Sequence, residues 1–111
     1  MDVLTADIAA LIVDETVKRT QHNINIMNFN GEILASYDKS RIGTRHEGAC
    51  MVIEEGRTMV FSDTESEDMQ GTQAGVNLPI IFQDNIVGVI GITGDPKALE
   101  QIADLVKMST E

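Results

Sequence analysis

The sequence predicts an α+β fold: a five-stranded antiparallel sheet with a helix at each end of the chain and a short helix in the middle. Three observations predict it. Apolar residues recur at helical spacing near both ends, strand-like segments lie between them, and these segments comprise a leading hairpin and a run of three late strands, which favours an antiparallel sheet. A chain of 111 residues can bury one core, so residues 1–111 are expected to form a single domain.

The chain begins with a predicted helix and a predicted hairpin. The helix is indicated by apolar residues at helical spacing, Ile8, Leu11, Ile12 and Val17, and it fades at residues 21–23. Residues 23–29 and 32–37 predict two strands. The Asn30-Gly31 pair between them is typical of a type I′ turn, because both residue types tolerate positive φ.

The middle of the chain predicts a short helix, a strand and a loop. Thr44 and Glu47 fit a capping box that would start the helix, and Gly56 would end it. The apolar stripe of this helix consists of Ala49, Cys50, Val52 and Ile53. Residues 57–62 predict a third strand, and residues 63–71, with four acids and no periodicity, predict an exposed loop.

Two further strands and a helix complete the predicted fold. Residues 75–82 and 85–92 are joined by two residues only, which predicts an antiparallel pair. Pro79 lacks an N–H, so a bulge or an unpaired side is expected there. Asp95-Pro96 predicts the start of the last helix. We expect the two terminal helices on one face of the sheet and the middle helix with the acidic loop on the other.

Charge and composition exclude several classes of function. The net charge is −10, with 18 acids and 8 bases, so we expect no contact between this chain and nucleic acid. No apolar run reaches the roughly 20 residues of a membrane span, and the start carries Asp2 and Asp7 where a signal peptide would be basic. Cys50 is the single cysteine. A cytoplasmic protein without disulfide, metal or cofactor is expected.

Four stretches resemble a known family, in the same order and at compatible spacing. They are NINIMNFNGEILAS (23–36), RIGTRHEGA (41–49), GVNLPI (75–80) and GVIGITGDP (88–96). They are similar to the N-terminal sensory domain of carbohydrate diacid regulators, the sugar diacid recognition family of transcription factors. The resemblance implies a PAS/Cache-like fold and a ligand that is a small hydroxy-acid or sugar diacid of the glycerate, glucarate or galactarate type.

Full-length members of that family carry a DNA-binding helix-turn-helix after the sensory domain. This chain ends at Glu111 without one. We therefore expect either an excised sensor or a stand-alone homologue, with any DNA-binding module elsewhere in a full-length regulator.

The predicted ligand site centres on Arg41 and His46, which match the family's RIG-x-x-HEGA pattern. Arginine presents a planar fork that fits a carboxylate. Free N–H groups at the helix start, from His46 to Ala49, would form a second anion site, which Gly48 leaves open to a ligand. Capping alone also explains Glu47. The predicted ligand contacts are Arg41, His46, Glu47, Gly48, Ala49, Asn77, Pro79, Gly91 and Thr93.

The same sequence bears on three other functions: catalysis, protein interaction and calcium binding. Cys50 and His46 lie four residues apart on one helix, but Cys50 shares the apolar stripe and nothing orients His46 as a base, so no enzymatic activity is expected. The alternative function is a profilin- or longin-like interaction or dimerisation module without a small-molecule ligand. A homodimer through the amphipathic first helix is expected. The DTESED acids offer a calcium site only weakly, since they lack the ligand order of an EF-hand.

Overall fold

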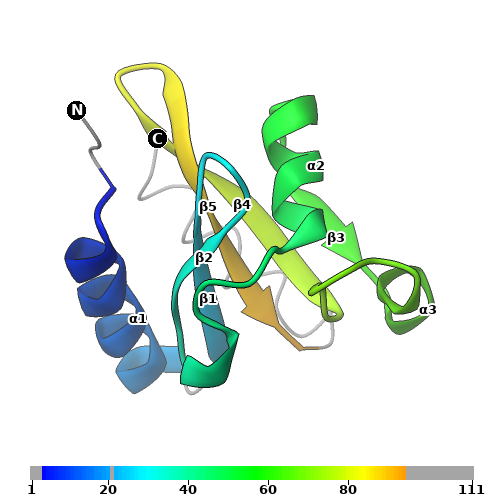
Figure 1. Ribbon diagram of the computed structural model, residues 1–111, viewed down its shortest axis with the longest axis horizontal. Coiled ribbons are helices and arrows are strands. Elements are labelled where there is room, and N and C mark those ends of the chain that lie inside the picture. Colours follow the sequence, from blue (N-terminus) through cyan, green and yellow to red (C-terminus); the bar gives the residue numbers. More distant parts are fainter. Residues whose placement is uncertain (1–3, 21, 95–111) are drawn as a thin grey trace.

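The computed structural model describes residues 4–20 and 22–94, and Figure 1 shows their arrangement. The elements follow in the order α1 (Ala6–Thr20), β1 (Asn23–Asn28), β2 (Ile33–Ser36), the 3₁₀ helix η1 (Lys39–Arg41), α2 (Glu47–Glu55), β3 (Met59–Phe61), α3 (Asp63–Glu67), β4 (Gly75–Phe82) and β5 (Asn85–Thr93). The predicted helix from residue 95 lies outside the described residues.

The five strands form one antiparallel sheet in the order β2-β1-β5-β4-β3. β5 therefore lies in the centre of the sheet, paired with β1 on one side and β4 on the other. The α+β prediction with a five-stranded antiparallel sheet is confirmed.

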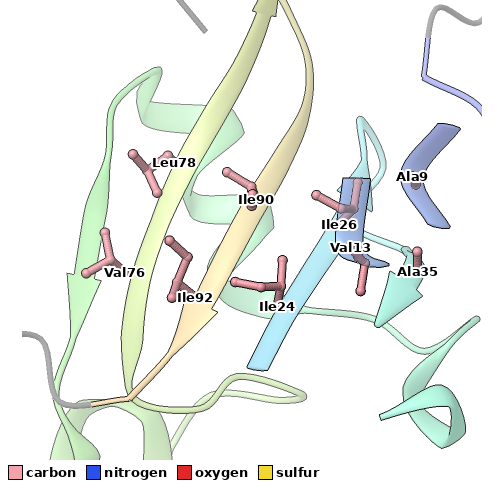
Figure 2. Packing of buried hydrophobic residues seen from close by; sticks show 9 residues of the cluster. All are labelled: Ala9, Val13, Ile24, Ile26, Ala35, Val76, Leu78, Ile90 and Ile92. Carbon is pink, nitrogen blue, oxygen red and sulfur yellow. The ribbon is translucent and has the colours of Figure 1, made fainter. Parts of the chain in front are cut away.

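The two longer helices lie on opposite sides of this sheet (Figure 1). Ala9 and Val13 of α1 pack on a layer of aliphatic side chains from β1, β2, β4 and β5 (Figure 2). That layer consists of Ile24, Ile26, Ala35, Val76, Leu78, Ile90 and Ile92, all at most 4% exposed. Each aliphatic side chain buried in this way contributes about 1.5–3 kcal/mol.

The opposite face of the sheet is apolar at one end only. There Ala49 and Val52 of α2 pack on Met27, Ile33 and Val89. Strand geometry requires this division, because successive side chains point to opposite faces. Met27 and Val89 are register partners and lie between residues whose side chains belong to the α1 face. Beside this cluster the α2 face carries polar side chains on the central strands, while Phe61 of β3 lies against Gly48 of α2.

Both predicted hairpins are present, but the turn of the first differs from the expected type. At Asn30-Gly31 only Gly31 has positive φ (80°), so the type I′ prediction is wrong. The Gly31 N–H donates to the Asn28 carbonyl, and the Asn28 side chain accepts from the N–H groups of Asn30 and Glu32. The asparagine before the pair, rather than the pair itself, organises the connection.

The capping predictions were also wrong in two places. The N-cap of α2 is His46, not Thr44; Thr44 Oγ1 donates to the Arg41 carbonyl, and Glu47 is the first helical residue. A capping box does exist at Ser62 and Glu65, where it starts α3 inside the segment predicted to be a loop. The C-terminal stop at Gly56, in the left-handed conformation, is as predicted.

Pro79 is accommodated as its chemistry requires. β3 pairs with β4 only at residues 75–77, so Pro79 lies beyond the end of β3. A register shift follows at Ile80/Ile81 in the pairing with β5. The predicted irregularity near Pro79 is therefore present.

Candidate functional site

A layer of polar side chains lies on the α2 face of the sheet, next to the apolar layer. Alternation along the strands sends Asn77, Gly91 and Thr93 to the face opposite Leu78 and Ile92. The same alternation places two more polar residues of the neighbouring strands on that face. We call the set the polar layer: Asn25, Ser36, Asn77, Gly91 and Thr93.

Gly91 forms the floor of this layer between two buried asparagines. It is the register partner of Asn25 on β1 and of Asn77 on β4, and both amides are 2% exposed. A Cβ at Gly91 would lie 2.7 Å from Oδ1 of Asn77. The Asn77 amide therefore occupies space that a side chain at position 91 would fill.

The asparagine amides keep hydrogen-bonding capacity that the protein does not use. Asn25 Oδ1 accepts from Ser36 Oγ at 2.5 Å, which leaves its NH₂ group open. Across residues 4–20 and 22–94, every side-chain nitrogen or oxygen that is shut off from solvent has a hydrogen-bond partner. None of the hydrogen bonds among these residues involves the Asn77 side chain, so its amide must be in contact with solvent. A group held in this way can bind a polar ligand.

His46 stands at the start of α2 and is 3% exposed. Its Nδ1 accepts the Ala49 N–H at 2.9 Å, so the neutral ring carries its proton on Nε2. Burial, reinforced by the charge of Arg41, lowers the pKa of His46 to about 4. At neutral pH His46 is therefore an uncharged donor through Nε2–H.

Arg41 links η1 to the loop before β4. Its Nη1 donates to Gln73 Oε1 at 3.1 Å, and its Nη2 donates to the Gly71 carbonyl. Thr93 of the polar layer donates to the same Gln73 oxygen at 3.4 Å. Partial burial lowers the pKa of Arg41, but the guanidinium stays charged at any physiological pH. One cation is thus connected to the edge of the polar layer through a single amide.

A cavity of about 1000 Å³ opens beside this network. Its lining includes Thr72, Gln73 and Thr93 together with Asp63 and Glu67 of α3. In Figure 1, α3 lies beyond β3 at the same end of the sheet as the β5 C-terminus. The cavity therefore borders both the polar layer, at Thr93, and the acidic helix α3.

The predicted second anion site at the α2 N-terminus does not exist. The N–H of Glu47 donates to the Gln70 carbonyl, that of Gly48 to Thr72 Oγ1 at 2.8 Å, and that of Ala49 to His46. The His46 N–H donates to the Gly31 carbonyl. Because all four N–H groups have protein acceptors, the prediction of free donors from His46 to Ala49 was wrong.

The predicted contact residues fall into two groups. Asn77, Gly91 and Thr93 belong to the polar layer, and Thr93 also lines the cavity. Arg41 and Gly48 donate to Gln73 and Thr72, which line the cavity, and His46 packs against Gly48. Glu47 instead accepts from the Gln70 N–H, Ala49 belongs to the apolar cluster under α2, and Pro79 is the register partner of Val89 in that apolar region. These last three belong neither to the polar layer nor to the lining of the cavity.

Four residues of the site were not predicted: Asn25, Ser36, Thr72 and Gln73. A signal for Asn25 was present, because it alternates with Ile24 and Ile26 and must face away from their core. Thr72 and Gln73 come from a loop whose path the sequence pattern does not specify.

Metal binding and membrane insertion find no support in the described part of the chain. No cluster of three or more His, Cys, Asp or Glu side chains within residues 4–20 and 22–94 is arranged to hold a metal ion. Over the same residues, no helix is both long enough and apolar enough to cross a bilayer.

Two solved structures share the fold of this chain. The GAF domain of an Acinetobacter phosphoenolpyruvate-protein phosphotransferase superposes with a TM-score of 0.62 at 10% identity, covering 88% of this chain and 75% of that one. The sensor domain of the Vibrio cholerae histidine kinase DctB superposes with a TM-score of 0.58 at 23% identity, covering 86% and 40%. The prediction of a PAS/Cache-like fold is confirmed.

Sequence comparison gives the family. The chain is 40% identical to the Escherichia coli (strain K12) carbohydrate diacid regulator over 108 residues, 97% of this chain. It is 31% identical to YsfB of Bacillus subtilis (strain 168) over 94% of this chain, and 36% identical to a Haemophilus influenzae protein over 93%. The chain spans 28% of the length of each relative. Residues 4–111 match the family described as "Putative sugar diacid recognition", and the chain belongs to that family.

Proposed function

We propose that this chain is the ligand-sensing domain of a transcription regulator and binds a small hydroxy-acid or sugar diacid, of the glycerate, glucarate or galactarate type, at the polar layer. One observation carries the proposal. Two asparagines, each 2% exposed, flank a glycine on three adjacent strands and keep unused hydrogen-bonding groups. Buried amides are costly unless satisfied, so a layer of this kind is suited to a polyhydroxylated ligand.

Each side chain has a role that its chemistry supports. Arg41 supplies the charge for a carboxylate, with guanidinium N–H groups beyond those given to Gln73 and Gly71. His46 supplies the Nε2–H donor. The amides of Asn25 and Asn77 both donate and accept, which is what hydroxyl groups require. Gly91 leaves room for the Asn77 amide, and Gly48 leaves room for the side chains of Phe61, Thr72 and His46 that pack against it.

The E. coli relative supports the ligand class, since its name is carbohydrate diacid regulator. Because this chain spans 28% of that relative, the DNA-binding module of a complete regulator is assigned to a separate segment. The domain itself is proposed to contact no nucleic acid, to perform no catalysis and to act in the cytoplasm, with the ligand changing the arrangement of α1 or of a dimer.

Thermal unfolding with glycerate, glucarate and galactarate tests the proposal. At least one acid should raise the Tm, on the order of 10 °C at a hundredfold excess over Kd. Arg41→Ala should weaken binding by about 10- to 100-fold, because it removes a charge-assisted hydrogen bond to the carboxylate. The matched control is Arg45→Ala, which removes the same charge from an exposed side chain and should leave the Tm shift intact.

The Arg45→Ala control distinguishes the loss of the Arg41 side chain from a general effect of net charge on binding. If both arginine variants lose the Tm shift equally, binding depends on net charge and not on Arg41. If no acid shifts the Tm at millimolar concentration, the ligand proposal fails and the profilin- or longin-like interaction module becomes the better account.

A further inference from the structure

Gln73 connects Arg41 to the polar layer and also lines the cavity. Its Oε1 accepts from Arg41 Nη1 at 3.1 Å and from the Thr93 hydroxyl at 3.4 Å. Arg41 is not among the residues that line the cavity. A ligand that enters the cavity beside Thr93 therefore contacts Gln73, which in turn contacts the cation.

The orientation of the Gln73 amide follows from its partners. A guanidinium has N–H donors and no acceptor, so the amide atom that faces Arg41 must be the oxygen. The NH₂ group of Gln73 forms no hydrogen bond within residues 4–20 and 22–94, and the side chain is exposed. Because Nε2 and Oε1 are bonded to the same carbon, this unused donor lies next to the guanidinium.

The backbone on each side of Gln73 is held in place. Thr72, 8% exposed, accepts the Gly48 N–H at its Oγ1, and the Ala74 carbonyl accepts the Gly94 N–H at 2.9 Å. A side chain that is exposed to a ligand but fixed at its base loses little conformational freedom when the ligand binds.

Arg41 also strengthens the Gln73 amide as a donor. A cation that donates to an amide oxygen polarises the amide, and its N–H groups then donate more strongly. Hydrogen bonds to an anionic acceptor are stronger than those between neutral groups. The NH₂ group of Gln73 is therefore suited to a carboxylate more than to a hydroxyl.

From these contacts we infer that Gln73 is a ligand-contacting residue of the site: its NH₂ group donates to a carboxylate oxygen of the ligand, and its Oε1 positions Arg41 beside that carboxylate. The inference rests on the proposed function and adds a contact to it. It holds for an acid with one carboxylate or with two, because one carboxylate fills this position.

Gln73→Glu tests the contact by replacing the NH₂ donor with an anionic oxygen, while the other oxygen still accepts from Arg41 and Thr93. The probe is whichever of glycerate, glucarate and galactarate raises the Tm most. Titration calorimetry on the whole chain at about pH 7.5 should show binding weakened about 100-fold or more, through a lost hydrogen bond and a new repulsion. The urea midpoint should not fall, since the bond to Arg41 persists.

The matched control is Gln83→Glu, the same chemical change at an exposed residue beyond the other end of β4. It should change the Kd less than about twofold. Gln73→Ala, which removes the donor without adding a charge, should weaken binding about tenfold.

A second measurement is needed because Gln73→Glu also neutralises the charge of Arg41. Side-chain amide signals in ¹H–¹⁵N spectra report donation directly, and the Gln73 pair is identified by its absence from the Gln73→Glu spectrum. At saturation with the acid, one Gln73 NH₂ proton should move downfield, whereas the Gln83 pair should stay in place.

The outcomes separate this inference from the proposed function. If an acid binds the native chain but Gln73→Glu binds it within about threefold as tightly, or the Gln73 NH₂ signals do not move, the inference is overturned and the proposed function stands. If none of the three acids binds at millimolar concentration, the proposed function fails and the inference fails with it.

Discussion

At the scale of single residues, His46 joins the stability of the fold to the chemistry of the site. Its Nδ1 caps α2 by accepting the Ala49 N–H, and this bond assigns the proton to Nε2. Its Cε1 would lie 3.1 Å from a Cβ at Gly48, so the ring packs directly on the helix start. A charged imidazolium could not accept the Ala49 N–H at Nδ1, so protonation and capping exclude each other.

This exclusion makes the stability of the domain depend on pH. The pKa of His46 is about 4 in the folded chain, below its ordinary value of 6.5. Above pH 6.5 the imidazole is neutral in both states and the full stability is present. Between about pH 6.5 and 4 the unfolded chain binds a proton that the folded chain does not, so the free energy of unfolding falls by on the order of 3 kcal/mol.

His46→Asn isolates this contribution, because asparagine can accept the Ala49 N–H and does not titrate. Urea unfolding of both proteins across this pH range gives the comparison, and the shared carboxyl groups cancel in the difference. We expect the stability of the native protein to fall toward that of the variant, or below it, as the pH drops. Parallel curves would contradict the assigned pKa and the assigned tautomer.

At the scale of elements, the sequence predicted strands and helices well and their ends poorly. Hydrophobic alternation placed β1, β2, β4 and β5, because burial against α1 leaves no freedom in register. The charge of the segment from Asp63 predicted a loop, although Ser62 and Glu65 carry the capping signature of a helix start. His46, not Thr44, caps α2, and its N–H donates to Gly31 of the β1–β2 turn, which lies against α2. The local sequence does not specify this approach of the turn to the helix.

The β4–β5 turn shows the same limit. Gln83 and Asp84 both have positive φ, 50° and 65°, which is the conformation expected for Asn30-Gly31 and not adopted by Asn30. The two-residue connection requires it, since a type I′ turn matches the twist of the paired strands. Neither residue prefers this region, so the turn holds strain that glycine would remove.

Asp84→Gly should therefore stabilise the domain by about 0.5–1 kcal/mol, measured as a higher urea midpoint at unchanged slope. Thr64→Gly is the control, because Thr64 is an exposed residue inside α3 and glycine there should lower stability by a similar amount. A lower midpoint for Asp84→Gly would mean that the positive φ values store no strain.

At the scale of the whole molecule, the site is a product of strand order. Asn25 and Gly91 are 66 residues apart in the sequence, and Asn77 lies between them. The strand order β2-β1-β5-β4-β3 makes the three residues neighbours. Sequence reasoning could identify Asn77 and Gly91 through the family motifs. It could not pair them with Asn25, because the pairing of β1 with β5 is a long-range contact that no local pattern encodes.

The predicted homodimer also belongs to this scale, and we propose that α1 forms its interface. Leu11 and Ile8 of α1 are 63% and 46% exposed, on a helix whose Ala9 and Val13 face the sheet. Burying such side chains against a second copy removes apolar area from water. Two chains of net charge −10 repel each other, however, so electrostatics oppose the association that the apolar surface favours.

This opposition predicts a dimer that salt strengthens. Raising NaCl from about 0.01 M to 0.1 M shortens the screening length from about 30 Å to about 10 Å, which weakens the repulsion between the two chains. Sedimentation equilibrium should then show tighter dimerisation at the higher salt. Leu11→Ser should weaken the dimer at both salts, whereas Val60→Ser, on an exposed apolar residue of β3, should not. A monomer under all conditions would remove α1 as an interface, and equal loss in both variants would place the contact elsewhere on the apolar surface.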